Sequence, residues 1–379
     1  MDFTLTEEQK MLRAMVRDFA EKELEPIAAR IDEEACFPTE QVKQLLALGL
    51  AGVSFPEKYG GGGGGKMEEI IVDEELSRVC ASIDTILFAS SGLAGYPLYQ
   101  FGNEEQRQRF VAPVAKGEKL ACFALTEAGA GSDVAALETT ARRQKGGYTL
   151  NGSKIFISNG AQAEIALVFA TMDKSLRHRG ITAFIVEQGT PGFSVGKHEN
   201  KLGIRASSTT ELIFEDCFVP EANRLGNEGE GFKIALSAID ASRVSVAGQG
   251  VGIAQGAFDK ALAYAKERQQ FGQPIANFQG IQWFLADMAT AIDAARLLTY
   301  RAAYLQDLGV PFIKEASMAK VFAAEAAMMV TTKAIQIHGG YGYVKDYPLE
   351  RYFRDARILE IYEGTSEMQR LTIAKALLA

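Results

Sequence analysis

The sequence predicts an α+β fold with an N-terminal all-α domain, a middle antiparallel β-barrel or sandwich, and a C-terminal four-helix bundle. Three observations support this prediction. Apolar residues recur at helical spacing in the first third of the chain, close-set strands without intervening helices follow, and long Ala-rich helical runs fill the last third. A chain of 379 residues also exceeds the usual size of one compact core. The expected domains are residues 1–118, 119–226 and 227–379.

The N-terminal domain opens with a helix-start pattern. Thr6 supplies a capping hydroxyl, and Gln9 follows three residues later at the head of an apolar-periodic run. Further helices are expected around residues 39–49, 67–80, 83–101 and 104–117. The glycine run from Gly60 to Gly65 is too flexible for the interior of a helix or strand, so we expect a surface loop there.

The middle domain is predicted from about residue 118, where strand patterns begin. Residues 122–126 are a predicted strand, and Asn151-Gly152 is predicted to be the turn of a β-hairpin spanning residues 148–158. Further strands are expected at residues 165–170, 181–186, 193–197 and 209–219. Because no helices separate these strands, the sheet is expected to be antiparallel rather than built from βαβ units.

The C-terminal domain is predicted to contain four long helices joined by short links, which is typical of an antiparallel bundle. The expected helices are residues 230–266, 276–308, 312–338 and 364–378. Within the first of them, the stretch from Gly248 to Gly252 imitates a dinucleotide-binding fingerprint. However, Ile253 replaces the third glycine and no strand precedes the stretch, so its small residues are predicted to allow close helix–helix contact.

Composition excludes several classes of protein. The apolar fraction of 47% and charged fraction of 23% are those of an ordinary globular protein, and the net charge of −8 argues against a nucleic-acid partner. No run approaches 18 apolar residues, so no membrane span is expected. The acidic N-terminus is unlike a signal or transit peptide, which favours a cytoplasmic location in a bacterium. The three histidines show no metal-ligand spacing, so no metal site is expected.

One acidic residue near the C-terminus stands out. Glu363 lies between apolar Ile361-Tyr362 and the small pair Gly364-Thr365. Such surroundings can desolvate a carboxylate, raise its pKa to roughly 6–7 and make it a general base. The alternative is a glutamate at a helix start with Gly364 as a turn residue. These five residues alone leave both interpretations open.

Four segments, in order, resemble the acyl-CoA dehydrogenase family, and the resemblance covers nearly the whole chain. The signature Leu125-Thr-Glu-Ala-Gly-Ala-Gly-Ser-Asp133 departs from the family only in having Ala128 where proline is common. The others are Arg268–Gln279, Gln336–Gly342 with the following Arg354-Asp-Ala-Arg357, and Ile361–Gln369. Together these motifs imply the family's helix–sheet–helix fold and FAD as cofactor.

The resemblance implies specific contacts to FAD. Residues from two strands and their loop would hold the flavin ring, and segments near the C-terminus would hold the nucleotide tail. The implied contacts are Phe123, Leu125, Thr126, Gly131, Ser132, Phe156, Ile157, Ser158, Arg268, Phe271, Gln279, Gln336, Gly339, Gly340, Thr365 and Glu367. In relatives the tail contacts come from a neighbouring subunit, so a homotetramer built as a dimer of dimers is expected.

The reaction implied is α,β-dehydrogenation of an acyl-CoA thioester. Glu363 would remove the α-proton, hydride would pass to flavin N5, and an electron-transferring flavoprotein would accept the electrons. One branch of the family carries its base directly before Arg243, but Ser242 stands there, which favours Glu363. The implied substrate contacts are Ser132, Asp240, Arg243, Tyr362, Gly364 and Asp84. Asp240 and Arg243 could instead be a plain i,i+3 helix pair.

The acyl group is the open question. The sequence is most similar to short-chain, butyryl-type bacterial members, in which a small residue usually occupies the position of Asp84. Asp84 is therefore either the cap of the helix that begins there or a second acid/base facing the acyl end, as in dehydrogenases of alicyclic acyl-CoAs. Two other classes remain: an acyl-CoA oxidase, whose chains are typically longer, and a non-catalytic flavoprotein paralogue, which the presence of Glu363 disfavours.

Overall fold

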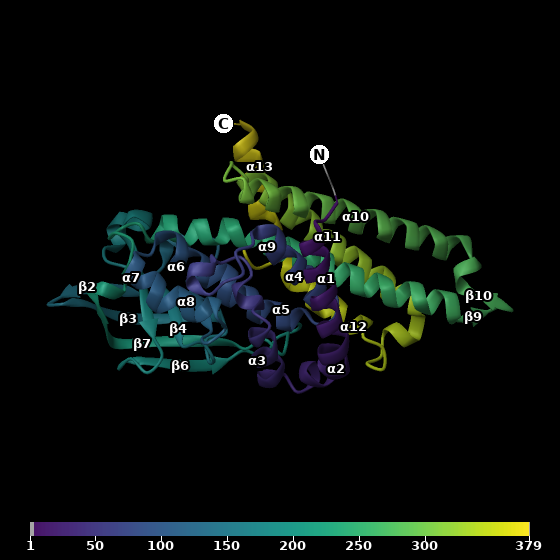
Figure 1. Cartoon of the computed structure of the whole chain (residues 1–379), viewed down its shortest axis with the longest axis horizontal. Helices are drawn as coiled ribbons and strands as arrows, with labels where there is room; N and C mark the ends of the chain where they lie inside the picture. Colours follow the sequence, from purple (N-terminus) through teal and green to yellow (C-terminus); the bar gives the residue numbers. More distant parts are fainter. Residues whose placement is uncertain (1–3, 379) are drawn as a thin grey trace.

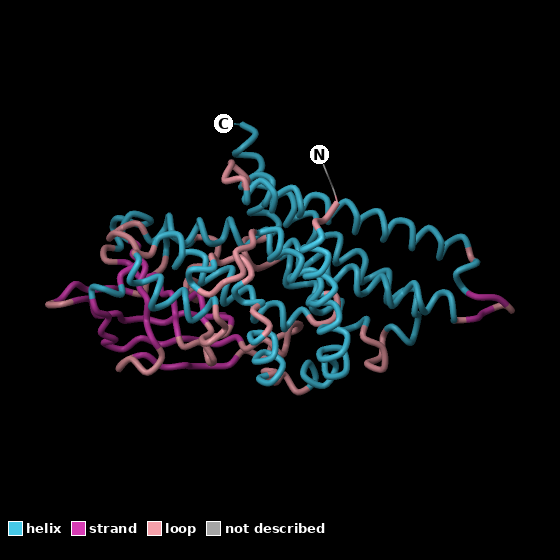
Figure 2. Tube along the Cα trace, in the orientation of Figure 1, coloured by secondary structure: helices cyan, strands magenta, loops and turns pink. Residues whose placement is uncertain are grey.

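The structure is a computed structural model that describes residues 4–378, and it confirms the predicted order of helical, β-sheet and helical parts. Figure 1 shows the sheet at one end of an elongated molecule, while the long C-terminal helices extend to the other end. The tube in Figure 2 shows the strands gathered in that one region, apart from a short hairpin at the opposite tip. Within residues 4–378, no helix combines the length and the apolar character needed to cross a membrane.

The N-terminal part is a set of short helices. Their bounds are α1 Glu7–Phe19, α2 Glu25–Glu33, α3 Thr39–Ala47, α4 Lys66–Ser77, α5 Ala81–Phe88, α6 Tyr96–Phe101, α7 Glu104–Gln106 and α8 Ala112–Ala115. The predicted capping box is present, because Thr6 accepts from the Gln9 backbone and Gln9 accepts from that of Thr6. The expected helix at 83–101 is interrupted by a π-helical segment, Ala89–Gly95, which is buried throughout.

The middle part is one open sheet of eight strands. Its strands are β1 Ala121–Ala124, β2 Thr140–Gln144, β3 Gly147–Ser158, β4 Ile165–Thr171, β5 Ile181–Glu187, β6 Phe193–His198, β7 Thr209–Pro220 and β8 Arg224–Leu225. The order is β6-β7-β3-β2-β4-β5-β8, with β1 attached to β4. The sheet is not closed into a barrel. Most pairings are antiparallel as predicted, but β4 pairs in parallel with both β1 and β2.

The predicted hairpin turn at Asn151-Gly152 is wrong. Both residues lie inside the single twelve-residue strand β3, at a shift in its register with β7. The Asn151 side chain accepts a hydrogen bond from the Asp216 backbone at 2.8 Å, so it is bound across the sheet instead of forming a turn. A Cβ on Gly152 would lie 2.7 Å from Thr139, which explains the glycine. The pattern therefore marks a β-bulge.

The C-terminal part contains three long helices and two shorter ones. They are α9 Gly231–Glu267, α10 Gln279–Asp307, α11 Ile313–His338, α12 Leu349–Ala356 and α13 Ser366–Leu378, and the hairpin β9 Gln269–Gln270 with β10 Gln273–Pro274 joins α9 to α10. Helix α12 was not predicted. The glycines of α9 allow close packing as expected, since a Cβ on Gly252 would lie 2.3 Å from the Glu74 carbonyl oxygen.

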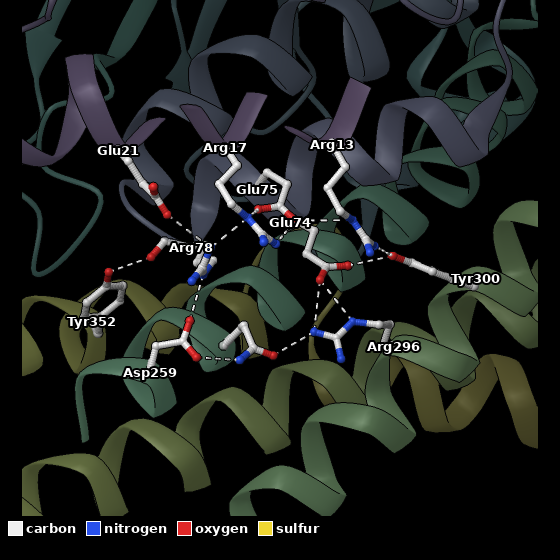
Figure 3. Close-up of polar contacts among 11 residues, drawn as sticks. Arg13, Arg17, Glu21, Glu74, Glu75, Arg78, Asp259, Arg296, Tyr300 and Tyr352 are labelled. Atoms are coloured by element: carbon white, nitrogen blue, oxygen red, sulfur yellow. Dashed lines mark hydrogen bonds and ion pairs between the residues drawn. The ribbon is translucent and has the colours of Figure 1, made fainter. Parts of the chain in front are cut away.

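Helix α4 connects the N-terminal part to this bundle, because it packs against α9 and α10. Figure 3 shows the ion pairs at this junction. Buried Glu75 accepts two hydrogen bonds from Arg17 of α1, at 2.8 and 2.7 Å, while buried Glu74 accepts from Arg296 of α10 at 3.0 Å. These bonds fix α4 between α1 and α10, and α4 in turn supports the site described next.

Candidate active site

Glu363 lies on an irregular turn between residue 360 and the start of α13. Its backbone is left-handed, with φ of 51°, and Gly364 follows with φ of 87°. A positive φ in a residue other than glycine is a strained conformation that persists only where neighbours impose it. The turn character predicted for Gly364 is therefore present, and it presents the Glu363 side chain to helix α9.

Three side chains hold this turn. Lys320 of α11 donates to the Gly364 carbonyl oxygen at 2.7 Å. Gln369 of α13 donates to the carbonyl oxygens of Glu363 at 3.0 Å and Gly364 at 2.8 Å. Arg243 of α9 approaches the Glu363 carbonyl oxygen at 3.5 Å. Because the two carbonyl groups are bound from three different helices, the backbone strain at Glu363 is maintained by the fold.

The carboxylate of Glu363 accepts a hydrogen bond from the Ser242 hydroxyl at 2.9 Å. Burial raises the pKa of Glu363, while the Ser242 bond and the positive charges of Lys320 and Arg243 act in the opposite direction. Burial likewise lowers the pKa of Lys320 to about 8. Glu363 is therefore a partly desolvated carboxyl group whose ionisation is tuned by three neighbours, as a general base requires.

The backbone N–H of Glu363 is a further polar group of this turn. Among residues 4–378, none accepts a hydrogen bond from it, whereas the preceding N–H of Tyr362 donates to the Ile358 carbonyl oxygen at 3.1 Å. A free N–H beside a carboxylate can bind a substrate oxygen while the carboxylate reacts with a neighbouring carbon.

Tyr362 connects Glu363 to Asp84. The Tyr362 hydroxyl donates to the Gln249 side chain, and the amide of Gln249 donates to Asp84 at 2.8 Å. Asp84 is fully buried and also accepts from Ser77 at 2.8 Å. Helix α5 begins at residue 81 after an extended Cys80, and Asp84 lies in its first turn without capping it. The helix-cap interpretation of Asp84 is therefore wrong.

Asp84 shares its surroundings with a second buried carboxyl group. Asp73 of α4 is buried close enough to Asp84 for the two carboxyl groups to oppose each other's ionisation. Burial raises the pKa of Asp84 to about 7 in spite of its hydrogen bonds. Burial and the nearby Asp84 raise the pKa of Asp73 well above its usual range.

The predicted flavin-ring residues lie at the sheet end of the molecule. Phe123 and Leu125 are on or next to β1, and the loop that follows exposes Gly131 and Ser132. The Thr126 carbonyl oxygen accepts from the backbone of β3 at 2.9 Å. Sequence reasoning missed the ion pair that holds this loop: Glu127 and Lys154, both buried, lie 2.6 Å apart.

The second predicted ring segment, Phe156 to Ser158, is the end of β3. Phe156 has φ of 59° and its side chain is 59% exposed, whereas Ile157 is buried. The register of β3 with β7 shifts between Lys154 and Ile157, so the bulge turns Phe156 out of the sheet. An exposed aromatic ring beside the 123–132 loop has the character expected of one face of a flavin pocket.

The predicted nucleotide-tail residues lie at the other end of the molecule. Arg268, Gly339 and Gly340 line one pocket of about 480 Å³, and a Cβ on either glycine would meet open space. Gln279 and Gln336 are exposed, and Phe271 is 92% exposed. Helix α9 runs unbroken from Ser242, which contacts Glu363, to its C-cap Arg268, so these two residues are about 40 Å apart along α9. One chain therefore does not bring the ring and tail segments together (Figure 1).

The remaining predicted contacts surround the turn at Glu363. Asp240 and Arg243 form an ion pair at 2.6 Å, as expected if they are a plain i,i+3 helix pair. Arg243 is also buried against the turn at Glu363. The Thr365 hydroxyl accepts from the Met368 backbone at 3.3 Å at the start of α13, and Glu367 is exposed.

Comparison with known proteins bears directly on this arrangement. Family profiles described as the N-terminal, middle and C-terminal domains of acyl-CoA dehydrogenase match residues 6–118, 122–217 and 229–378. The short-chain specific acyl-CoA dehydrogenase of Clostridium acetobutylicum is 52% identical over 374 residues, which cover 99% of each chain. The chain belongs to the acyl-CoA dehydrogenase family.

Two solved structures are similar to this acyl-CoA dehydrogenase over 100% of both chains with TM-scores of 0.99. One is butyryl-CoA dehydrogenase from Megasphaera elsdenii, at 47% identity. The other, at 49% identity, is a chain in a structure titled "Electron transferring flavoprotein of Acidaminococcus fermentans: Towards a mechanism of flavin-based electron bifurcation". Like its family, the chain is an FAD-dependent oxidoreductase.

The residues present fit FAD. The exposed ring of Phe156 and the bare backbone of Gly131 offer an apolar face and hydrogen-bonding groups at one end of the molecule. At the other end, Arg268 beside two unobstructed glycines suits a pyrophosphate, because its guanidinium can fork onto phosphate oxygens. Local patterns gave no signal for Lys320, Gln249 or Lys154, whose roles come from contacts between helices and strands.

Proposed function

We propose that this acyl-CoA dehydrogenase oxidises a short-chain acyl-CoA thioester to its enoyl-CoA, with Glu363 as the base that removes the α-proton. The observation that carries the proposal is the pairing of a desolvated carboxylate with a backbone N–H, on the same residue, that has no acceptor among residues 4–378. No other carboxylate occupies the alternative base position, where Ser242 stands and donates to Glu363.

The α-carbon of a thioester is only weakly acidic, so the proton acceptor and the developing enolate oxygen both need stabilisation. Burial makes Glu363 more basic, while the Ser242 hydrogen bond and the positive charges of Lys320 and Arg243 favour its ionised form. The N–H of Glu363 would donate to the thioester oxygen as that oxygen gains negative charge. One preorganised donor of this kind is worth about 2.7–4 kcal/mol. Bound FAD supplies the acceptor for the β-hydrogen as hydride.

The acyl group is proposed to be short because two aromatic rings pack against each other next to Glu363. Phe88 and Tyr362 meet edge to face, with centroids 6.1 Å apart, next to the polar group of Gln249 and Asp84. The similar proteins named for short-chain and butyryl substrates support this assignment. An electron-transferring flavoprotein is the proposed electron acceptor, which is supported by the likeness to a chain in the structure titled for that protein.

A complete FAD site is proposed to require more than one subunit, as in a homotetramer. The separation of about 40 Å along α9 between Ser242 and Arg268 exceeds what a single bound cofactor would bridge within one chain. Large exposed side chains at the distal end, including Phe271 and Tyr343, are then explained as contacts between copies. Light scattering on the FAD-loaded protein tests this assembly, and a stable FAD-loaded monomer would contradict it.

The test of the base is Glu363→Gln, which keeps the side-chain volume and removes the acid. The variant is expected to bind FAD normally, yet butyryl-CoA should no longer bleach the flavin in stopped-flow measurements. Rapid bleaching by the variant would refute the assignment. If wild-type protein is yellow but inert to every acyl-CoA, it is a non-catalytic paralogue, and oxygen consumption matching substrate oxidation would identify an oxidase.

A second candidate substrate class is supported by Asp84. Asp84 is buried, has a pKa of about 7, and is linked by hydrogen bonds through Gln249 to Tyr362, the residue before Glu363. Such a group could act as a second acid/base on a remote carbon of an alicyclic acyl-CoA. Turnover of cyclohexane- or cyclohexene-carboxyl-CoA that is lost in Asp84→Asn would support it. Equal turnover by wild type and Asp84→Asn would exclude it.

A further inference from the structure

The two segments expected to hold the flavin ring are joined to each other by a buried ion pair. Lys154 of β3 and Glu127 of the loop after β1 lie 2.6 Å apart, and their side chains are 0% and 8% exposed. The Lys154 ammonium group also donates to the Leu125 carbonyl oxygen at 3.0 Å. The next residue of β3, Ile155, donates its backbone N–H to the Thr126 carbonyl oxygen at 2.9 Å. Two consecutive residues of the strand therefore bind three consecutive residues at the start of the loop.

The Glu127 carboxylate also closes this loop at its far end. It accepts hydrogen bonds from the backbone N–H groups of Glu138 at 2.5 Å and Thr139 at 3.0 Å. The backbones of Glu127 and Ala130 exchange two hydrogen bonds of 3.1 Å, so the chain turns sharply just before Gly131. One buried side chain thus holds both ends of the loop that carries Gly131.

The other expected ring segment begins two residues after Lys154. Phe156 is turned out of the sheet by the bulge in β3 and is largely exposed. Because Lys154 and Ile155 are bonded to the loop, the same bonds fix the position of Phe156 relative to that loop. A buried polar network whose members are satisfied makes the structure around it rigid. The separation between the loop and the exposed aromatic ring therefore depends on this ion pair.

Stability alone does not account for a buried ion pair at this place. Well-packed apolar side chains of similar volume are often equally stabilising or more so, because two charges lose their hydration when they are buried. An ion pair adds direction instead. The Glu127 carboxylate binds three donors from two other segments of the chain, whereas an apolar side chain would specify none of these positions.

We propose that Glu127 and Lys154 are positioning residues for the flavin ring of FAD, because they set the distance between the 125–132 loop and Phe156. The inference rests on the proposed placement of the flavin ring at these two segments. It adds two residues that do not line the surface of the site. Both side chains are buried, so they act on the ring through the residues beside them, Thr126 and Phe156.

A matched pair of isosteric variants separates positioning from stability. Glu127→Gln keeps the side-chain volume and removes the charge that binds Lys154. Asp32→Asn is the control, because Asp32 is likewise a buried carboxylate 2.6 Å from a cation, Arg354, but belongs to neither ring segment. Glu127→Asp keeps the charge on a side chain that is one methylene group shorter, and it serves if the glutamine variant does not fold.

The measurements are the dissociation constant of FAD, from flavin fluorescence as the FAD-loaded proteins are diluted, and the visible absorption spectrum of bound flavin. In Glu127→Gln we expect the dissociation constant to rise by about tenfold, as for the loss of one good hydrogen bond, and the shoulders of the flavin band to broaden. Glu127→Asp should change both in the same direction. Asp32→Asn should lower stability in urea and leave both unchanged.

An unchanged dissociation constant and spectrum in every folded Glu127 variant would overturn the proposal. Equal changes in Asp32→Asn would overturn it as well, because general destabilisation would then explain them. These measurements contain no acyl-CoA, so they are independent of the base assignment. Flavin bleaching of wild type by butyryl-CoA tests the proposed function separately.

Discussion

Ser242 offers the sharpest test of how the base is tuned. Its hydroxyl lies 2.9 Å from the Glu363 carboxylate and 3.0 Å from the Ile239 carbonyl oxygen, and its single proton can serve only one of them at a time. When Glu363 is ionised, the Ser242 hydroxyl donates its hydrogen bond to the carboxylate. When Glu363 is neutral, the hydroxyl can donate to the Ile239 carbonyl oxygen instead. A hydrogen bond to a charged group contributes about 1.5–3 kcal/mol, and the competing acceptor favours the lower figure.

Replacement of Ser242 by alanine should therefore raise the pKa of Glu363 by about one unit, since each unit corresponds to about 1.4 kcal/mol. The base acts in its ionised form, so kcat/KM rises with pH through this pKa. Removing a hydrogen bond that stabilises the ionised form moves this rising limb of the kcat/KM profile to higher pH. Below the limb, kcat/KM should fall by roughly tenfold, while the plateau at high pH should change little.

The assay is the pH profile of kcat/KM for butyryl-CoA with a dye acceptor, measured for wild type and for both Ser242→Ala and Ser242→Thr. The threonine variant keeps the hydroxyl and should restore the wild-type limb. A limb at the same pH in all three proteins would refute the electrostatic reasoning, because Ser242 would then make no difference to the ionisation of Glu363.

Two further predictions concern stability. Burial raises the folded-state pKa of Asp84 to about 7, so the stability that Asp84 contributes is complete below its unfolded pKa and is lost as pH rises through about 7. In urea unfolding, the free energy of unfolding of Asp84→Asn should therefore decline less with pH than that of the wild type. An equally steep decline in both proteins would contradict the raised pKa of Asp84. Gly364→Ala should destabilise by about 1–2 kcal/mol, because φ is 87° there and a Cβ would lie 2.8 Å from Gln369. Gly280→Ala, with open space around its Cβ, is the matched control, and equal melting temperatures for both variants would argue against strain at Gly364.

Local patterns predicted the parts of the structure that local physics determines. The capping box at Thr6 and the strand-rich middle were recovered because a side chain bonds its own helix start and because apolar periodicity reflects one buried face. The Asn151-Gly152 turn failed for a non-local reason. Whether that dipeptide turns the chain or forms a bulge depends on β7, whose Asp216 backbone binds the Asn151 side chain.

The residues that support the site could not be predicted from local sequence patterns, because their roles also depend on contacts between distant segments. No local pattern pairs Glu127 with Lys154, and only the packing of the 125–132 loop on β3 buries them together. Lys320 sits in an Ala-rich helix with no neighbouring motif, yet it holds the Gly364 carbonyl oxygen. Glu363 was assigned as the base because Ile361–Gln369 resembles a family motif, whereas its immediate sequence neighbours alone left a structural turn residue equally open.

The position of Glu363 on a turn, rather than on a helix, follows from the two tasks proposed for it. A carboxylate at position 242 would lie inside α9, where the backbone N–H groups are bonded along the helix. At position 363 the left-handed backbone leaves the N–H without a partner among residues 4–378, so one residue can supply both the base and the donor to the thioester oxygen. The strain of that conformation is offset by Lys320 and Gln369, which bind the carbonyl groups on the opposite side of the turn. Moving the base along the chain would therefore separate two groups that this turn keeps together.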